Sequence, residues 1–270
     1  YTFSYDHFLR KYRSGVGLMF LQDRAGSGAL RTSSVGGLYS YVFSLSRSVA
    51  VRAGLRGSFA SRNLDFYNFK FSDQIIRDDP FLTIESFDRT GKTYFDFGTG
   101  AILFTEHYWF GYALDHLNRP NKSFMGQDSR VPLKHSIQGG YRIVVKQSAN
   151  GNVEQDVTIV SIYKGQQDWD QIDFGAYYQY NSLMAGMWYR GIPAIKSYKA
   201  GYPNNDAVII MIGAQVRGFF HFGYSYDVTI SKLGIGSKGA HEISMIYEFA
   251  QPDYKRNGKK QDFMVPCTKF

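Results

Sequence analysis

Several features that define common protein classes are scarce or absent in this sequence of 270 residues. It contains one cysteine, Cys267, which excludes a disulfide scaffold and any cysteine-based metal site. It contains no apolar run of about 18 residues, which excludes a transmembrane helix. Charged residues make up only 20% of the chain and aromatic residues are abundant. This composition excludes a disordered protein, which would be rich in charge and poor in aromatic residues.

The residues that are abundant follow a period of two. Aromatic residues make up 17% of the chain, and there are 28 glycines. Over 220–230 the even positions hold Phe, Tyr, Val and Ile, whereas the odd positions hold His, Gly, Ser, Asp and Thr. Segments 172–180, 49–59 and 133–146 alternate in the same way. Successive side chains of a strand point to opposite faces, so each segment predicts a strand with one apolar and one polar face. The pattern predicts an all-β chain.

The same pattern divides the chain into about 13 strands, many of them 10 to 14 residues long. Tilted strands of about 9–11 residues are what a bilayer crossing requires. A soluble two-sheet protein is the alternative, but its outward face would be charged, whereas these polar faces are rich in Gly and Ser. We therefore expect a transmembrane antiparallel β-barrel. The expected strands are 2–9, 14–22, 34–46, 48–61, 94–105, 107–117, 133–147, 156–164, 171–181, 183–191, 206–217, 219–230 and 240–249.

The connections between these strands alternate in length, as in outer-membrane barrels, where short turns are periplasmic and long loops external. Short turns are expected near Ser46–Ser48, Glu106–His107, Asn181–Ser182 and Arg217–Gly218. The long connections fall at 62–93, 118–132 and 192–205, with shorter ones at 23–33, 165–170 and 231–239. The expected organisation is a barrel over 1–250 with external loops, followed by a periplasmic tail over 251–270.

The topology also predicts a strand before Tyr1. Thirteen strands would place the start of the first one outside, whereas barrels of this kind have an even number of strands and begin in the periplasm. We therefore expect about 14 strands. The chain has neither an initiator methionine nor a signal peptide, so we expect it to derive from a longer exported precursor.

Charged residues of both signs fall on the polar faces of the expected strands. In a barrel they either line a water channel or pair and fill the interior. Their near balance favours paired networks and an occluded lumen over an ion-selective constriction, which would carry one sign. A passive pore is the rival interpretation. The expected lumen network comprises Arg52, Arg56, Asp96, Asp115, Arg142, Asp173, Arg190, Arg217, Asp227 and Glu248.

Two segments are candidate partner-binding surfaces. The loop 62–93 is rich in apolar residues in a region expected outside, so it either covers the barrel mouth or docks a partner. The tail 251–270 is basic and then hydrophobic, so it is either a disordered end, as termini usually are, or a segment that docks to periplasmic machinery. The candidate residues are Phe66, Phe69, Phe71, Ile75 and Ile76 in the loop, and Phe263, Pro266, Cys267 and Phe270 in the tail.

Motifs for other chemistry are weak. Gly234, Gly236 and Gly239 fit a dinucleotide-binding spacing, but they lie between two antiparallel strands instead of opening a helix. The six histidines form no zinc-binding pair, and the pair Ser182 and His221 is a poor candidate for hydrolysis because His221 lies on the polar face. The net charge of +8 is spread along the chain without a nucleic-acid motif. We expect no enzyme activity, cofactor, metal or nucleic-acid partner.

Several stretches resemble the PorP/SprF family of outer-membrane proteins, components of the type IX secretion system of Bacteroidetes. The resemblance extends over essentially the whole chain, and the order and spacing of these stretches carry it. A threonine at 268 stands where a proline is expected, and the family's opening segment is absent, which agrees with a missing first strand. The similar stretches are 15–26 (GVGLMFLQDRAG), 38–45 (LYSYVFSL), 64–74 (LDFYNFKFSDQ), 109–121 (WFGYALDHLNRPN), 222–233 (FGYSYDVTISKL), 239–249 (GAHEISMIYEF) and 265–270 (VPCTKF).

The resemblance implies a non-enzymatic protein of the outer membrane, in contact with its lipid and lipopolysaccharide. Such a protein would bind, retain or help export secreted proteins that carry a C-terminal signal domain, gliding adhesins among them. A second partner implied by the resemblance is the periplasmic lipoprotein ring of the secretion machine. The alternative function is a passive porin or transporter for small or hydrophobic solutes.

Overall fold

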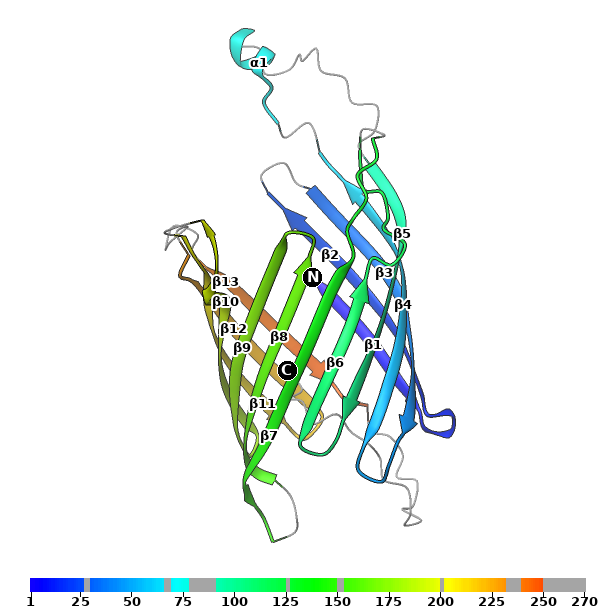
Figure 1. Cartoon of the computed structure of the whole chain (residues 1–270), viewed down its shortest axis with the longest axis vertical. Helices are drawn as coiled ribbons and strands as arrows, with labels where there is room; N and C mark the ends of the chain where they lie inside the picture. Colours follow the sequence, from blue (N-terminus) through cyan, green and yellow to red (C-terminus); the bar gives the residue numbers. More distant parts are fainter. Residues whose placement is uncertain are drawn as a thin grey trace. The chain divides into compact units, whose positions relative to one another are not determined.

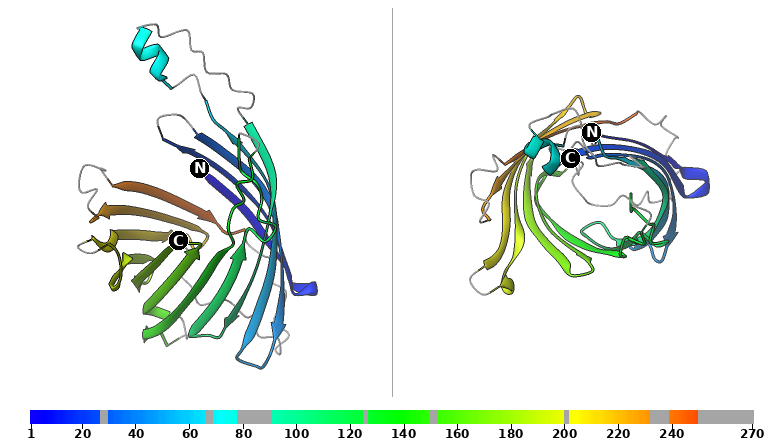
Figure 2. Two further views of the ribbon diagram at one scale, coloured as in Figure 1. Left: turned by 45° about the horizontal axis from the view of Figure 1, so that its top comes forward. Right: turned by 90° about the horizontal axis from the view of Figure 1, so that it is seen from above.

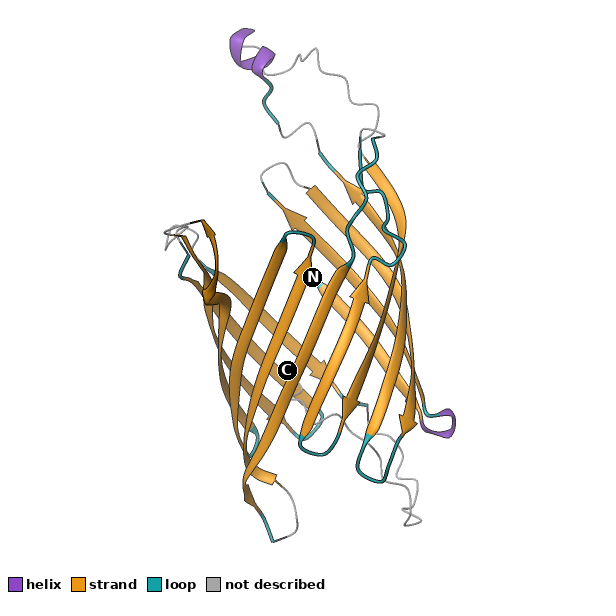
Figure 3. Ribbon diagram, viewed as in Figure 1, coloured by secondary structure: helices purple, strands orange, loops and turns teal. Residues whose placement is uncertain are grey.

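The computed structural model describes residues 1–26, 30–65, 69–77, 91–124, 127–149, 153–199, 202–231 and 239–249. Most of these residues lie in β-strands (Figure 3). Thirteen strands form one sheet in which each strand neighbours the next one in sequence (Figure 1). They are β1 (Thr2–Leu9), β2 (Ser14–Ala25), β3 (Leu30–Ser44), β4 (Ala50–Asn63), β5 (Gly91–Phe104), β6 (Tyr108–Asp115), β7 (Lys134–Gln147), β8 (Val153–Gln166), β9 (Trp169–Tyr180), β10 (Leu183–Lys199), β11 (Tyr202–Val216), β12 (Phe220–Thr229) and β13 (Ala240–Tyr247).

Each of the 13 segments predicted from period-two alternation overlaps one strand, which confirms the all-β antiparallel prediction. Successive strands pair antiparallel, as in β1 with β2 and β9 with β10, and the succession can be followed from two further directions in Figure 2. The tight turns fall where they were predicted. Asn181 (φ 52°), Arg217 (φ 52°) and Gly218 (φ 78°) adopt the left-handed conformation there, which matches the twist of two-stranded hairpins.

Two of the predicted loops are shorter than expected. The segment 192–205 was predicted as a long loop, but β10 continues to Lys199 and β11 begins at Tyr202. Their pairing shifts register between Arg190 and Gly191, where Gly191 has a φ of 144°. The extra residue at this shift is Asp206 of β11, and a second shift skips 193–196 of β10. Such irregularities interrupt the alternation of both strands, which is why the sequence pattern ended too early. Likewise, β2 and β3 extend into the predicted connection 23–33.

The chain also contains short helical turns that alternation could not predict. They are η1, a 3-10 turn (Arg10–Tyr12), and α1 (Ser72–Arg77), which lies within the segment 62–93. The Gln74 side chain accepts a hydrogen bond from Phe71 N–H (2.9 Å), as in half of a capping box. Six residues are too few to display a helical period. Among the described residues, no helix has the length and apolar character needed to span a membrane.

The chain forms two compact units. The first comprises 1–43, 52–101 and 113–135, and the second comprises 44–51, 102–112 and 136–270. Within each unit the burial of side chains is inverted relative to a soluble protein. In β5 of the first unit, Phe95 and Phe97 are 61% and 49% exposed, whereas Asp96 between them is 6% exposed. In β9 of the second unit, Asp173 is buried and Phe174 is exposed.

Two buried tryptophans of the second unit pack over glycines on neighbouring strands. The Trp109 ring occupies the space that a Cβ at Gly140 would need, and the Trp188 ring does the same at Gly175. Trp188 also meets Tyr177 edge to face, with 5.5 Å between ring centroids. A glycine beneath a large ring allows close packing within one layer of sheet, although glycine itself has a weak strand preference. These contacts place large aromatic groups among the buried side chains.

Candidate functional site: ion-pair clusters on the polar face

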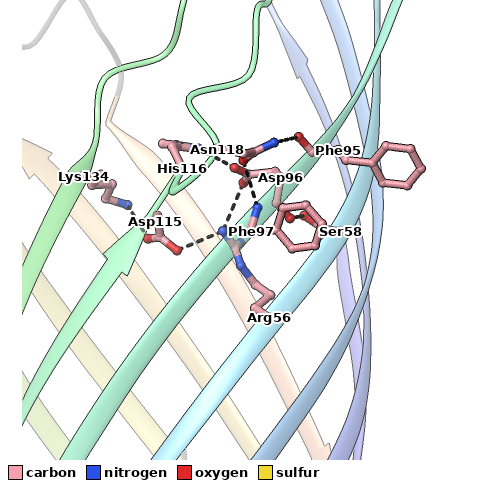
Figure 4. Close-up of polar contacts among 9 residues, drawn as sticks. All are labelled: Arg56, Ser58, Phe95, Asp96, Phe97, Asp115, His116, Asn118 and Lys134. Carbon is pink, nitrogen blue, oxygen red and sulfur yellow. Dashed lines mark hydrogen bonds and ion pairs between the residues drawn. The ribbon is translucent and has the colours of Figure 1, made fainter.

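The first cluster centres on Arg56, on the polar face of β4 in the first unit (Figure 4). Its Nη2 lies 3.1 Å from Asp96 Oδ2 on β5 and 2.9 Å from Asp115 Oδ1 at the end of β6. Lys134 Nζ approaches the other Asp115 oxygen at 4.0 Å. Two carboxylates and two cations therefore balance, which offsets the desolvation cost of burying Asp96.

Gly98 on β5 provides the space that this arrangement needs. A Cβ at Gly98 would lie 2.9 Å from Asp115 Oδ1 and 3.3 Å from Arg56 Nε. The side chain of Arg56 thus passes over a strand position that has no side chain of its own and reaches a carboxylate two strands away. The alternation of β5 places Gly98 on the same face as Asp96.

The connection that follows β6 is attached to β5 beside this cluster. His116, with a φ of 62°, places Nδ1 2.9 Å from Asp96 Oδ1. Asn118 Nδ2 donates to the Phe95 carbonyl (2.7 Å), and Phe97 N–H donates to Asn118 Oδ1 (3.3 Å). The Asn118 amide thereby takes the place of a strand backbone beyond the end of β6, as Figure 4 shows. The chain after β6 is thus fixed to β5 by these side chains and by one backbone hydrogen bond, from Leu117 N–H to the Phe97 carbonyl (3.0 Å).

The second cluster centres on Arg190 of β10 in the second unit. Arg190 Nε lies 3.3 Å from Asp173 Oδ1 on β9, the residue directly opposite it in the ladder. Arg190 Nη1 lies 3.0 Å from Asp227 Oδ2 on β12, across β11. Lys164 Nζ (3.4 Å) and two hydrogen bonds from Gln171 Nε2 (2.8 and 2.9 Å) complete the contacts of Asp173. This cluster spans five neighbouring strands, β8 to β12.

A third ion pair joins Arg142 of β7 to Asp156 of β8. The distance from Arg142 Nη2 to Asp156 Oδ2 is 2.7 Å, the shortest range for a charge-assisted hydrogen bond. Thr158 Oγ donates to the second Asp156 oxygen (3.3 Å), and both residues are almost fully buried. A buried carboxylate with two partners contributes to the rigidity of this strand pair.

The remaining residues of the predicted network are Arg52, Arg217 and Glu248, for which the structure gives other surroundings. The Arg52 guanidinium stands 5.6 Å from the centre of the Phe8 ring. Arg217 is exposed in the turn between β11 and β12. Glu248 Oε1 lies 3.8 Å from Nε2 of the buried His221. Seven of the ten predicted residues thus take part in the ion pairs of Arg56, Arg142 and Arg190, and the role of the network in lining a lumen stays a prediction.

The predicted partner-binding residues are described only in part. The Phe69 and Phe71 rings are tilted against each other, 6.4 Å apart between centroids. Ile75 and Ile76 of α1 are 68% and 83% exposed. Phe66 lies outside the described residues, and so do the four tail residues Phe263, Pro266, Cys267 and Phe270.

Sequence reasoning missed several partners in these clusters. Asp156 lies at the start of a predicted strand, and its alternation with Thr158 was the signal available. Lys164 and Gln171 fall at predicted strand ends, where facing direction is least certain. His116 and Asn118 adopt their positions outside any strand, so a period of two carries no information on them. Within the described residues, no group of three or more His, Cys, Asp or Glu is arranged to hold a metal ion.

Exposed apolar side chains on one face and paired charges on the other are the features of a β-sheet membrane protein. The comparison with known families agrees with this class. Residues 1–247 match the family model described as type IX secretion system membrane protein PorP/SprF, and the chain belongs to this family. A search of curated proteins found no match. Membership makes the chain a membrane component of the type IX secretion system.

Proposed function

We propose that this chain is an outer-membrane β-barrel of the type IX secretion system that binds, retains or helps export secreted proteins with a C-terminal signal domain. The observation that carries the proposal is the inverted sheet of this family member. Its strands of up to 17 residues expose apolar side chains to the bilayer, while the charges are held in ion pairs on the other face. In this proposal the sheet closes into a barrel of about 14 strands.

The balance of charge favours protein binding over passive transport. A selective pore concentrates charges of one sign at a constriction. Here each arginine of the clusters has one or more aspartate partners, and large rings such as Trp109 and Trp188 lie buried. Groups that are paired with each other are unavailable to a permeating ion. The proposed lumen is therefore filled instead of conducting.

The apolar residues around α1 are the proposed docking surface for the secreted protein. Ile75 and Ile76 follow each other in α1, and both are more than half exposed, with Phe69 and Phe71 just before the helix. Neighbouring exposed isoleucines are unfavourable in water and are typical of an interaction surface. In the proposed topology this segment is external, where an exported protein would meet it.

Affinity purification from the native membrane tests the proposal. The full chain would be purified in mild detergent through a tag in the external loop near residue 78, and co-purifying proteins identified by mass spectrometry. We expect a large secreted protein with its C-terminal domain. The double variant I75S/I76S should reduce its recovery at least about fivefold.

Leu45 supplies the matched control. It is 64% exposed in the turn between β3 and β4, so L45S makes the same chemical change at the opposite strand ends. L45S should leave recovery of the secreted protein unchanged. A chain that purifies alone and conducts ions in a planar bilayer would contradict the proposal and favour the porin.

We also propose that the tail 251–270 docks to the periplasmic lipoprotein ring. Its basic residues followed by Phe263, Met264 and Val265 combine charge with apolar anchors. Deletion of 251–270 should remove ring proteins from the purified complex while the secreted protein remains. Ring proteins recovered equally with and without the tail would contradict this second contact.

A further inference from the structure

Two cations of the first unit lie over aromatic rings near the Arg56 cluster. The Arg62 guanidinium of β4 stands 5.6 Å from the centre of the Phe124 ring, and the Lys122 ammonium stands 5.2 Å from the centre of the Tyr94 ring. All four side chains are half-buried. Phe124 and Lys122 belong to the connection after β6, whereas Arg62 and Tyr94 lie near the ends of β4 and β5. The two cation–ring contacts therefore join this connection to those two strands.

Among the described residues, the two cations have no counter-ions of the kind that their neighbour Arg56 has. In the described ranges of the chain, neither Arg62 nor Lys122 makes an ion pair with a carboxylate, whereas Arg56 contacts two. Burial lowers the pKa of the Lys122 ammonium, and the charge of Arg62 lowers it further, against a smaller opposing effect of Asp96. Two like charges held half-buried and close enough to repel make a local positive potential that an anion would relieve.

We propose that Arg62 and Lys122, flanked by Tyr94 and Phe124, form a binding site for an acidic polypeptide segment. The guanidinium of Arg62 can hold a carboxylate through two parallel hydrogen bonds, and the Lys122 ammonium adds a point charge. The two rings offer apolar surface to the stem of a glutamate or to its neighbours. The site deepens the proposed function, because it assigns to the exported partner an acidic stretch that contacts this end of the sheet.

The position of the pair distinguishes a peptide from a membrane lipid. Alternation along β4 places Arg62 on the same face as Arg56, whereas Leu55 and Phe59, 62% and 41% exposed, occupy the opposite face. Acyl chains lie against the apolar face of such a sheet, so the phosphate of a bilayer lipid would be on the wrong side. A polypeptide that reaches this end of the polar face meets both cations directly.

Binding of a labelled hexaglutamate peptide tests the site. The full chain in detergent micelles would be titrated into fluorescein-labelled hexaglutamate at low salt, with fluorescence anisotropy as the readout. The double variant R62Q/K122Q should bind about tenfold more weakly, because both charge-assisted contacts are lost. R62K/K122R keeps both charges and should bind within about threefold of the parent.

Arg130 provides the matched control, because it carries the same charge in the same connection but pairs with Asp128 at 3.1 Å. R130Q should leave hexaglutamate binding unchanged. Equal binding by R62Q/K122Q and the parent, or an equal loss in R130Q, would overturn the site. Inorganic phosphate or anionic phospholipid vesicles that displace the peptide at equal charge would overturn its assignment to a polypeptide. The measurement needs no secreted partner, so this site and the proposed function can fail separately.

Discussion

The Arg56 and Arg190 clusters both neutralise buried aspartates, but they do so with different arrangements of strands. In each, an arginine contacts an aspartate on the adjacent strand and a second aspartate two strands away. Arg56 extends in one direction only, from β4 over β5 to β6. Arg190 extends in both, to β9 on one side and over β11 to β12 on the other. Charges can therefore be neutralised within a single sheet layer wherever one long guanidinium spans several strands.

The clusters differ most in what else holds the buried aspartate. Asp173 has further partners on the strands, Lys164 and Gln171, which make contacts of 3.4 Å and 2.8 Å. Asp96 has His116 instead, from the connection after β6. The Arg190 cluster therefore stabilises the sheet alone, whereas the Arg56 cluster also couples the sheet to the segment that carries Lys122. This difference makes the Arg56 cluster the more sensitive of the two.

Removal of the central arginine should have the largest effect. R56Q should lower the free energy of unfolding by roughly 3 kcal/mol, because Asp96 is left buried without a full positive charge beside it. R190Q should lower it by only about 2 kcal/mol, because Lys164 and Gln171 remain on Asp173. Urea unfolding in detergent, followed by tryptophan fluorescence, measures both.

The order of the two effects is what the comparison predicts. R130Q, which removes an exposed arginine from the first unit, is the control and should change stability by less than about 0.5 kcal/mol. If R190Q proves as destabilising as R56Q, the extra partners of Asp173 contribute nothing, and the comparison is wrong.

The next largest effect concerns the strand positions that the arginines cross. G98A should lower the free energy of unfolding by about 2 kcal/mol, because its methyl group would lie 2.9 Å from Asp115 Oδ1 and 3.2 Å from the Leu114 carbonyl. Ala207 of β11 lies opposite Arg190 and is 4% exposed. A207G should cost under about 1 kcal/mol, through backbone freedom alone. Thermal unfolding of both variants compares a required glycine with a tolerated small residue.

The strands could be predicted because alternation records which residues face which side. Arg56, Asp96 and Asp115 were assigned to one network only because alternation places each on the polar face of its strand, and the structure joins them. Alternation does not give the register between strands, however, so the sequence did not reveal that Arg56 crosses Gly98. Register depends on how strands are paired, which the turn and the hydrophobic face set together.

The connection after β6 lay beyond sequence reasoning for a different reason. Asn118 contacts β5 through its side chain, 23 residues from Phe95 in sequence, and no local pattern encodes such a contact. The pairing of Lys122 with Tyr94 has the same origin. Similarly, the predicted strands on either side of 192–205 ended early because the register between β10 and β11 skips Asp206 and 193–196, which interrupts the alternation.

The next prediction concerns Asn118 and the local opening of the connection after β6, not the stability of the whole chain. N118A removes two hydrogen bonds to β5, each worth about 1 kcal/mol net, so residues 116–124 should open more often. The amide of Phe97 should then exchange with solvent about fivefold to tenfold faster, as measured by hydrogen exchange. N121A is the control, because Asn121 bonds Ser123 and Ser129 within its own connection. Unchanged exchange at Phe97 in N118A would show that the attachment rests on other contacts.

The smallest effect tests whether Lys164 can neutralise Asp173 when Arg190 is removed. Lys164 is 40% exposed along its side chain and 3.4 Å from Asp173, so K164Q alone should lower stability by at most about 0.5 kcal/mol. In an R190Q background, Lys164 becomes the remaining described cation on Asp173, and the same change should cost about 1.5 kcal/mol. A double-mutant cycle in urea measures this coupling. Strict additivity of K164Q and R190Q would mean that Lys164 does not compensate for Arg190, and the smaller sensitivity of this cluster would then have to come from Gln171.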